Sequence, residues 1–374
     1  MVSIKEVNTK KELKQFIKFP FELYKGHKLW VPPLMADEKR TLRTDLNPSF
    51  SAGCEAAYFM AYKDGKIAGR IAAIVNHRAN EKWKNKTARF GWIDFIDDYD
   101  VSGALLEAAE QWSKSKGMTA VHGPMGFTDF DIEGMLVEGF EHLPPIISPY
   151  NYPYYPQHLE KHGYGKAVDW LQYRFNASQP VPEKVNRINQ LIAQKYNLRT
   201  VIFRKKKEIM PYACKFFEAI NVSWENIYGF VPFTPEQITY YLKSFFSFLR
   251  PELTCFILDD KDNLVGFGLS MPTLSRAFQK AKGKLFPFGF IHILKSLNKY
   301  SDIDLYVNGV LPEWQHRGIH SLYYVAMNEL YIQHHVKIAI SSSQLETNTN
   351  ALGIWENYEK ELLFRTRCYI KENI

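Results

Sequence analysis

The sequence lacks the features that mark secreted and membrane-spanning proteins. Its longest apolar candidate, Leu285–Leu294, is far shorter than the ~20 residues that span a bilayer, and Pro287 and Gly289 interrupt it. Met1–Glu6 has no apolar stretch typical of a signal peptide. The 4 cysteines include no CxxC pair, which argues against a zinc site and suits a reducing compartment. We therefore expect a cytoplasmic protein with no metal and no stable membrane insertion.

Acidic residues are in deficit. The chain has 47 Lys and Arg against 40 Asp and Glu, a net charge of +7, which favours anionic ligands such as phosphates. Because the basic residues are interspersed with acids, DNA binding is not expected. With 374 residues and 46% hydrophobic residues, the chain is long enough for two soluble domains.

The chain contains two halves with the same predicted order of elements: strand, helix, hairpin, strand, helix, strand, helix, strand. We expect mixed-sheet α/β domains at 1–178 and 179–374, with the boundary in the Pro-rich segment Ala177–Glu183. Hairpins are predicted around Asp64-Gly65 and Asp259–Asn263. Alternation and helical periodicity also predict the strands Ala167–Phe175, Asp302–Val310 and Leu363–Ile370 and the helices Ala104–Lys116, Gly318–His334 and Asn350–Glu361.

One loop in the second half has residues suited to binding a phosphate group. It follows the predicted strand Asp302–Val310 and leads into the helix Gly318–His334, with the sequence Gln315-His316-Arg317-Gly318-Ile319-His320. A helix N-terminus offers unpaired N–H groups and a partial positive charge, which together suit a diphosphate. A side chain at Gly318 would hold the backbone away from the phosphates. The loop therefore predicts a phosphate site, although a surface turn has the same composition.

The loop resembles the acetyl-CoA signature of the GNAT superfamily of N-acetyltransferases, Gln/Arg-x-x-Gly-x-Gly/Ala, with His320 departing from the usual small residue. The resemblance implies that the loop from Gln315 to His320 binds the CoA pyrophosphate. It also implies that the preceding strand end, Val310 and Leu311, holds the pantetheine arm. The implied cosubstrate is acetyl-CoA or another acyl-CoA.

A second motif follows in the right order. Asn350, Ala351, Tyr358, Glu359, Lys360 and Phe364 resemble the family pattern Asn-x-x-Ala-x-x-x-Tyr-Glu-Lys-x-Gly-Phe, although Leu362-Leu363 replaces the Gly. By this resemblance Tyr358 is the general acid for the leaving thiolate, or else a core tyrosine beside Ile354 and Trp355. Asn350 positions the pantetheine, caps the helix, or does both.

Acyl transfer to an amine also calls for a base and an oxyanion site. Asp304 falls where some family members carry a catalytic Glu, while its ordinary alternative is a strand-edge Asp facing solvent. Glu313 is a second candidate base, and Glu346 is a candidate for the acceptor side. A backbone N–H near Asn308–Val310 would meet the oxyanion.

The first half resembles the family but lacks its phosphate loop. The equivalent junction, Phe95–Gly103, contains three acids and no Arg, so we expect no CoA there by the usual mode. Asn151–Tyr164 resembles the second family motif. The loop Gly123–Asp131 is either part of an acceptor site or a plain connection. The aromatic segment Pro149–Tyr155 is either a pocket wall or local core.

An insertion at Thr273–Tyr300 separates the second hairpin from the cofactor strand. It is basic and aromatic, and three uses are open: a lid, a docking site for a membrane or acyl chain, or a packed helix pair. The leading functional hypothesis is a tandem GNAT-like N-acyltransferase acting on a small-molecule or peptide amine. The alternatives are a Fem-type aminoacyl transferase and a non-catalytic acyl-CoA or metabolite binder; the oligomeric state is open.

Overall fold

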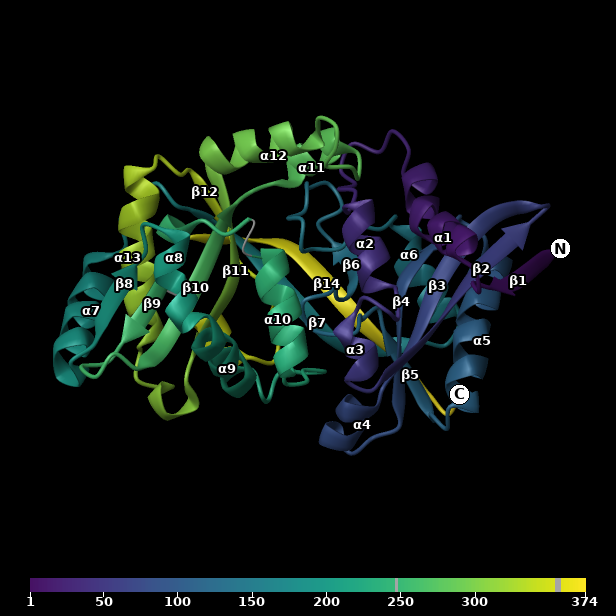
Figure 1. Cartoon of the computed structure of the whole chain (residues 1–374), viewed down its shortest axis with the longest axis horizontal. Helices are drawn as coiled ribbons and strands as arrows, with labels where there is room; N and C mark the ends of the chain where they lie inside the picture. The colour runs from purple at the N-terminus through teal and green to yellow at the C-terminus, as the bar shows by residue number, and fades with distance from the viewer. Residues whose placement is uncertain (246–247, 354–357) are drawn as a thin grey trace. The chain divides into compact units, whose positions relative to one another are not determined.

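The computed structural model describes residues 1–245, 248–353 and 358–374. The chain forms two compact units (Figure 1). Unit 1 contains residues 1–170, 275–292 and 364–374, and unit 2 contains residues 171–274 and 293–363. The units are therefore interleaved in sequence.

Unit 1 is built on the hairpin of β2 (Cys54–Lys63) and β3 (Lys66–Asn76). Asp64 and Gly65 both have positive φ, 50° and 75°, which is the backbone that a tight hairpin turn requires. The predicted hairpin is thus confirmed. The strand order continues on both sides with β1 (Val2–Glu6), β4 (Thr87–Phe95) and β5 (Ala120–Gly123), and β5 runs parallel to β4.

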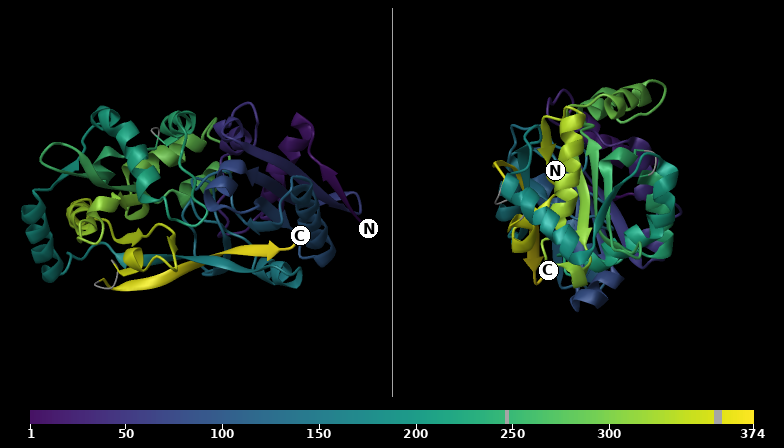
Figure 2. Two further views of the ribbon diagram at one scale, coloured as in Figure 1. Left: turned by 90° about the horizontal axis from the view of Figure 1, so that it is seen from below. Right: turned by 90° about the vertical axis from the view of Figure 1, so that its left-hand side faces the viewer.

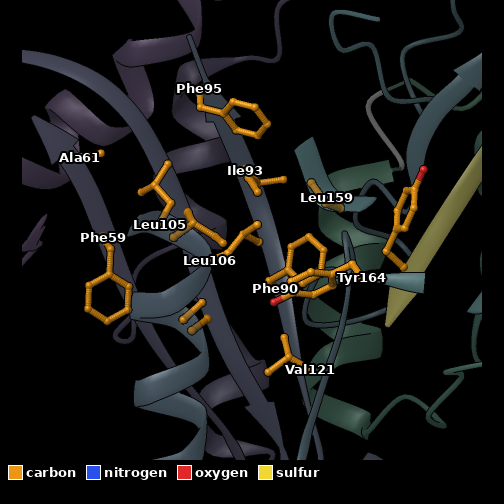
Figure 3. Close-up of a cluster of buried hydrophobic side chains, with 14 of the residues drawn as sticks. Phe59, Ala61, Phe90, Ile93, Phe95, Leu105, Leu106, Val121, Leu159 and Tyr164 are labelled. Carbon is orange, nitrogen blue, oxygen red and sulfur yellow. The ribbon is translucent and has the colours of Figure 1, made fainter. Parts of the chain in front are cut away.

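Helices cover both faces of this sheet. On one face, α5 (Tyr99–Ser115) packs Leu105 and Leu106 against strand side chains that include Phe59 and Phe90 (Figure 3). Each such side chain contributes roughly 1.5–3 kcal/mol when fully buried. On the other face, α1 (Lys10–Leu23) buries Phe16; its N-terminus is closed by a capping box between Thr9 and Glu12. The remaining elements are α2 (Met35–Thr41), α3 (Pro48–Ser51), α4 (His77–Trp83), β6 (Met135–Glu138), α6 (Tyr154–Lys161) and α11 (Ser275–Ala281).

Unit 2, like unit 1, is built on a sheet that is covered by helices. Its sheet order contains β12 (Ile338–Ile340), β11 (Asp302–Val310), β10 (Leu264–Pro272), β9 (Thr254–Leu258) and β8 (Arg199–Ile202). The helix α13 (His320–Gln333) packs Leu322, Tyr323 and Met327 onto this sheet. The other elements are α7 (Glu183–Tyr196), α8 (Lys206–Ile209), α9 (Ala213–Ser223), α10 (Pro235–Phe245), β13 (Gln344–Leu345) and α14 (Thr349–Gly353). The helix α12 (Gly289–Asn298) contributes residues to both units.

Two long strands, β7 (Gly165–Asn176) and β14 (Lys360–Glu372), each contribute residues to both units; β14 is the long yellow arrow in Figure 2. In unit 1, β14 pairs with β5 through Tyr369 and Gly123. In unit 2, β7 pairs with β12 through Asn176 and Ile338. Each sheet thus includes a strand from the other half of the sequence. The boundary at 178/179 stays a prediction.

The predicted helix Asn350–Glu361 is wrong at its end, where Tyr358 to Glu361 are not helical. α14 ends at Gly353, and Lys360 and Glu361 already belong to β14. Glu361 forms an ion pair with Arg174 of β7, so strand pairing overrides the helical periodicity there. Ile354 and Trp355, expected on the apolar face of this helix, lie outside the described residues.

Candidate functional site

In unit 2, β11 separates from its parallel neighbour after a short pairing. β12 pairs with Asp302, Ile303 and Asp304 within the described chain. The register of β11 against β10 also shifts between Leu269 and Ser270, so that Tyr306 is an extra residue in β11. Within the described residues, the pairing of β11 with β12 thus ends at Asp304, and β11 continues beyond it to Val310. An extended ligand with amide groups can pair with a strand edge.

The loop after β11 presents consecutive free N–H groups. His316 and Gly318 have positive φ, 58° and 72°, and Arg317 lies between them. Among the described residues, the backbone N–H groups of His316 to His320 donate no hydrogen bond. Alternating backbone of this kind forms a concave anion site, and here it leads into the N-terminus of α13. We call residues 316–320 the N–H cradle.

Two side chains and one glycine define the cradle. Gln315 Nε2 donates to the Val310 carbonyl at 3.0 Å, which closes the loop on the end of β11. Gly318 cannot be replaced without strain, because its φ is +72° and an added Cβ would lie 2.8 Å from Cδ1 of Ile192. The Arg317 guanidinium lies over the rings of Trp314 and Tyr196, at 5.3 and 5.5 Å from their centroids. Arg317 is thereby held at the cradle with its side chain exposed.

The strand end predicted to hold pantetheine already has protein partners. The Val310 carbonyl accepts from Gln315, and the Leu311 N–H donates to the Val265 carbonyl at 2.9 Å. The Leu311 carbonyl accepts from the Trp314 N–H at 2.8 Å. The Asn308 carbonyl accepts from Trp224 Nε1 at 3.2 Å. The roles predicted for Val310 and Leu311, and for an oxyanion donor at Asn308–Val310, stay predictions.

His320, the departure from the family signature, begins α13. Burial lowers the pKa of its imidazole to about 4, so the ring is neutral near pH 7 and adds no cationic charge to the cradle. Ile319, the helix N-cap position, is buried in the core. His316 has an exposed side chain. The cradle is thus made of backbone groups, with Arg317 within it and Lys195 over the same Tyr196 ring, 4.9 Å from its centroid.

Asp304 is the most perturbed acid of unit 2. Its side chain is on β11, the residue is 1% exposed, and Oδ1 accepts a hydrogen bond of 2.7 Å from Thr273 Oγ1. Oδ2 has no hydrogen-bond partner among the described atoms. Burial raises the pKa of Asp304 to about 7. The expectation of a solvent-facing strand-edge Asp is therefore wrong, and a carboxyl group near neutrality is suited to accepting a proton.

Tyr358 lies on the other side of β11. It packs against the cluster that contains Ile303, Leu305 and Tyr324, whereas strand alternation directs Asp304 to the opposite face. Burial raises the pKa of Tyr358 to about 12, which keeps the phenol protonated. Asn350 lies in the short α14, and the structure describes its backbone position only. Tyr358 and Asp304 thus belong to opposite faces of the sheet of unit 2, and the Tyr358 ring contacts Phe175 of β7.

Sequence reasoning missed residues that the fold brings to this region. Thr273, on the segment after β10, bonds Asp304, and no motif marks it. Tyr306, the bulged residue, is buried with a hydroxyl that has no partner among the described atoms. The aromatic pair Trp314 and Tyr196 supports Arg317, and only the position of Trp314 beside the loop gave a signal. Glu313, the second candidate base, is exposed.

Unit 1 has the same strand geometry and a closed helix terminus. The Asp98 carboxylate accepts from the N–H groups of Asp100 and Val101 at 3.0 and 3.2 Å and pairs with Lys63. The Tyr99 ring is stacked on His158 with centroids 4.0 Å apart. Protein groups therefore occupy the position of the cradle.

The two regions of unit 1 proposed for the acceptor are internally bonded. In the loop Gly123–Asp131, the Asp131 carboxylate accepts from the N–H groups of Phe127 and Thr128 at 2.8 and 3.0 Å. In the aromatic segment, Tyr152 stacks on Tyr24 with centroids 4.9 Å apart. These contacts match a structured connection and local packing, as two of the alternatives anticipated.

Two curated relatives and one solved structure resemble most or all of the chain. Protein YghO of Escherichia coli (strain K12) is 30% identical over 97% of this chain and 93% of its own length. Bacterial ceramide synthase of Caulobacter vibrioides (strain NA1000 / CB15N) is 28% identical over 78% of this chain and 76% of its own length. A tandem GNAT protein from the clavulanic acid biosynthesis pathway has a TM-score of 0.55 and 12% identity, covering 100% of this chain and 99% of that one.

No family model matches the chain. The solved neighbour establishes the fold: two GNAT-like domains in tandem, as the sequence motifs predicted. None of the helices in the described residues is both long enough and apolar enough to cross a bilayer.

Proposed function

Because the chain belongs to the family of protein YghO and has the tandem GNAT fold, we propose that it is an acyl-CoA-dependent N-acyltransferase whose active site lies in unit 2. The observation that carries this proposal is the N–H cradle of residues 316–320 at the start of α13. The residues fit CoA. Five successive N–H groups that donate no hydrogen bond among the described residues, together with Arg317, would hold its pyrophosphate. The part of β11 beyond its pairing with β12 would lie along the pantetheine arm.

Asp304 and Tyr358 have separate proton-transfer roles in the proposed reaction. Asp304, with a pKa of about 7, is half ionised at neutral pH, and its carboxylate accepts a proton from the substrate ammonium, which leaves the neutral amine that attacks. The amine nitrogen bonds to the thioester carbon, and the carbon–sulfur bond breaks as the tetrahedral intermediate collapses. Tyr358, protonated at neutral pH, gives its proton to the departing thiolate. Donor and acceptor react directly in a ternary complex.

The acceptor that we propose to test first is a long-chain amino alcohol. Bacterial ceramide synthase, 28% identical to this chain, is named for making a ceramide, which is an N-acylated long-chain amino alcohol. A small-molecule or peptide amine with acetyl-CoA is the second choice. Aminoacyl transfer and non-catalytic acyl-CoA binding are outcomes of the same experiment.

The experiment combines calorimetry with thiol release. We expect CoA and acyl-CoA to bind at one site per chain, and free CoA thiol to appear with an amine from a panel that includes long-chain amino alcohols, polyamines and peptides. Tyr358→Phe should retain CoA affinity and lower kcat by about 100-fold. Tyr300→Phe is the matched control, because the Tyr300 hydroxyl has no hydrogen-bond partner among the described atoms. Absence of CoA binding would refute the proposal; binding without turnover on any amine would identify a binder.

A further inference from the structure

The insertion between β10 and β11 presents an unusual surface. Residues 273–300 contain six basic residues and no acidic residue: Arg276, Lys280, Lys282, Lys284, Lys295 and Lys299. The structure folds them into α11, a tight connection and α12 (Figure 1). None of these lysines forms an ion pair in the part of the chain that the structure describes. All six basic residues have exposed side chains, and four of them, Lys282, Lys284, Lys295 and Lys299, lie within residues 282–299.

Large apolar side chains are exposed among these lysines. Phe286 is 75% and Phe288 is 68% exposed, and Ile291 and Leu294 continue the exposed apolar face along α12. Ile293 and Leu297 are buried on the opposite face of the same helix. α12 is therefore apolar on both faces. We call the exposed residues Phe286, Phe288, Ile291 and Leu294, with the four lysines, the 282–299 surface.

The base of this segment is fixed to unit 1, so the exposed rings are presented by an ordered scaffold. Gly283 lies where an added Cβ would meet the Phe21 ring at 2.4 Å, and its carbonyl accepts from the Met35 N–H at 3.0 Å. Gln279 Nε2 donates to the carbonyls of Lys28 and Trp30 at 2.8 and 3.1 Å. Gly289 is equally constrained, because a Cβ would lie 1.8 Å from the Lys284 carbonyl oxygen.

We propose that the 282–299 surface docks the protein onto the anionic surface of a lipid bilayer. Exposed Phe, Ile and Leu gain free energy when they enter the boundary between headgroups and acyl chains. Lysines beside them are attracted to anionic headgroups, and the absence of acids from residues 273–300 removes local repulsion. The 10-residue α12 is suited to lying along the interface rather than spanning it.

This charge pattern favours an anionic bilayer over a second copy of the chain or a free acyl chain as the partner of the 282–299 surface. A second copy of the chain would bring another Lys-rich surface against this one, which is unfavourable without counterions. A free acyl chain would satisfy the rings and leave the four lysines without an anionic partner. The inference is independent of the proposed acyltransferase activity, because it concerns residues outside the cradle and can be tested without substrate.

The test is co-sedimentation of the full chain with vesicles. We expect binding to phosphatidylcholine vesicles that contain phosphatidylglycerol, little binding to phosphatidylcholine alone, and weakening by salt. Phe286→Ser/Phe288→Ser and, separately, Lys282→Glu/Lys284→Glu should each lower the partition coefficient by about tenfold or more. Leu46→Ser/Met210→Ser removes two exposed apolar side chains elsewhere and should leave binding unchanged.

Three results would overturn the proposal. They are no binding to anionic vesicles, equal binding with and without phosphatidylglycerol, or binding that the surface variants do not lower. Dimerisation that depends on Phe286 and Phe288 in gel filtration, without vesicle binding, would assign the surface to a second copy instead. Circular dichroism and melting temperature establish that each variant is folded. CoA binding is measured in parallel, so that loss of the proposed active site is recognised separately.

Discussion

Unit 1 and unit 2 have a similar strand arrangement but differ in the charge of a buried side chain and in the groups at the start of the next helix. In unit 1, β4 pairs in parallel with β5 over Thr87 to Arg89. In unit 2, β11 pairs with β12 over Asp302 to Asp304. A bulge follows in each strand, at Trp92 in β4 and at Tyr306 in β11. The two units can therefore be compared position by position.

The last residue of each short parallel pairing is buried and charged, with opposite sign. In unit 1 it is Arg89, whose Nη1 donates to the Gly126 carbonyl at 2.9 Å. In unit 2 it is Asp304, which leaves Oδ2 without a partner among the described atoms. An arginine is always protonated and cannot accept a proton, whereas this carboxyl titrates near neutrality. The difference concerns this one position, because burial also raises the pKa of Glu38 in unit 1 to about 7.

The helix that follows shows the same contrast. In unit 1, the Asp98 carboxylate accepts from N–H groups at the start of α5. In unit 2, the N–H groups at the start of α13 donate no hydrogen bond among the described residues. A carboxylate cap and a phosphate satisfy the same N–H groups, so one excludes the other. We therefore expect an anionic ligand at the start of α13 and none at the start of α5, and the mutations below test that expectation.

The largest effect is expected at Asp304. Asp304→Asn should lower kcat by about 10²- to 10⁴-fold at pH 8 and leave CoA affinity unchanged, because the amide cannot accept the proton. Steady-state kinetics and calorimetry measure the two quantities. Asp302→Asn, on the same strand, is the control and should stay within about twofold. Equal losses in both variants would remove the special role of Asp304.

The same variant has a stability signature with a defined sign. The folded-state pKa of Asp304 is about 7, against 3.8 for the unperturbed group. Between these values the folded state holds a proton that the unfolded state has lost, so stability falls as pH rises through this window. Asp304→Asn should therefore raise the melting temperature relative to wild type at pH 8 and match it near pH 4. A variant that is less stable at pH 8 would contradict the buried, unpaired carboxylate.

The next effect is expected at the cradle. Gly318→Asp should weaken CoA binding by about 100-fold or more, because it strains a positive-φ position and introduces the kind of carboxylate that unit 1 carries. Gly117→Asp is the matched control: Gly117 has φ +77° and no atom within 4 Å of an added Cβ, and it follows α5 in unit 1. Calorimetry with CoA gives both affinities. If the two variants bind CoA equally well, the phosphate site lies elsewhere.

Local sequence patterns predicted much of this architecture, and non-local contacts determined the rest. Asp64-Gly65 and the loop Gln315–Gly318 contain their structural information within a few residues, and both were predicted. The exchange of β7 and β14 depends on pairing with strands far away in sequence, such as Tyr369 with Gly123, which periodicity does not report. The helix extended to Glu361 failed for the same reason.

The sequence predicted which residues form the candidate site, but not their backbone conformation, burial or hydrogen bonds. Positive φ at His316 follows from the loop backbone, and a non-glycine residue there gives no sequence signal. Asp304 was identified by its spacing from Gly318, but its burial and its bond from Thr273 come from packing. The cap at Asp98 was anticipated only as excess acid in a junction.

A smaller effect is expected from opening the terminus of unit 1. Asp98→Ala removes the oxygen that accepts from the N–H groups of Asp100 and Val101, together with the Lys63 ion pair, and should lower the free energy of unfolding by ~1 kcal/mol. Urea denaturation measures this change. CoA stoichiometry should stay at one per chain, because the stacked Tyr99 and His158 still fill the position. A second CoA in the variant would mean that the cap alone distinguishes the two units.

The smallest effect is a shift of the pH profile. The Thr273 hydroxyl donates to Asp304 and thereby lowers the pKa of that carboxyl against the larger effect of burial. Thr273→Val removes this bond, so the pKa should rise and the acid limb of kcat/KM should move to higher pH. Activity falls about threefold near pH 6.5 and is unchanged on the alkaline plateau, because the base is then ionised in both proteins. Thr254→Val, a buried Thr that bonds the Arg250 carbonyl instead, should leave the profile in place. A shift toward lower pH, or a uniform loss at all pH values, would show that Thr273 acts on something other than the ionisation of Asp304.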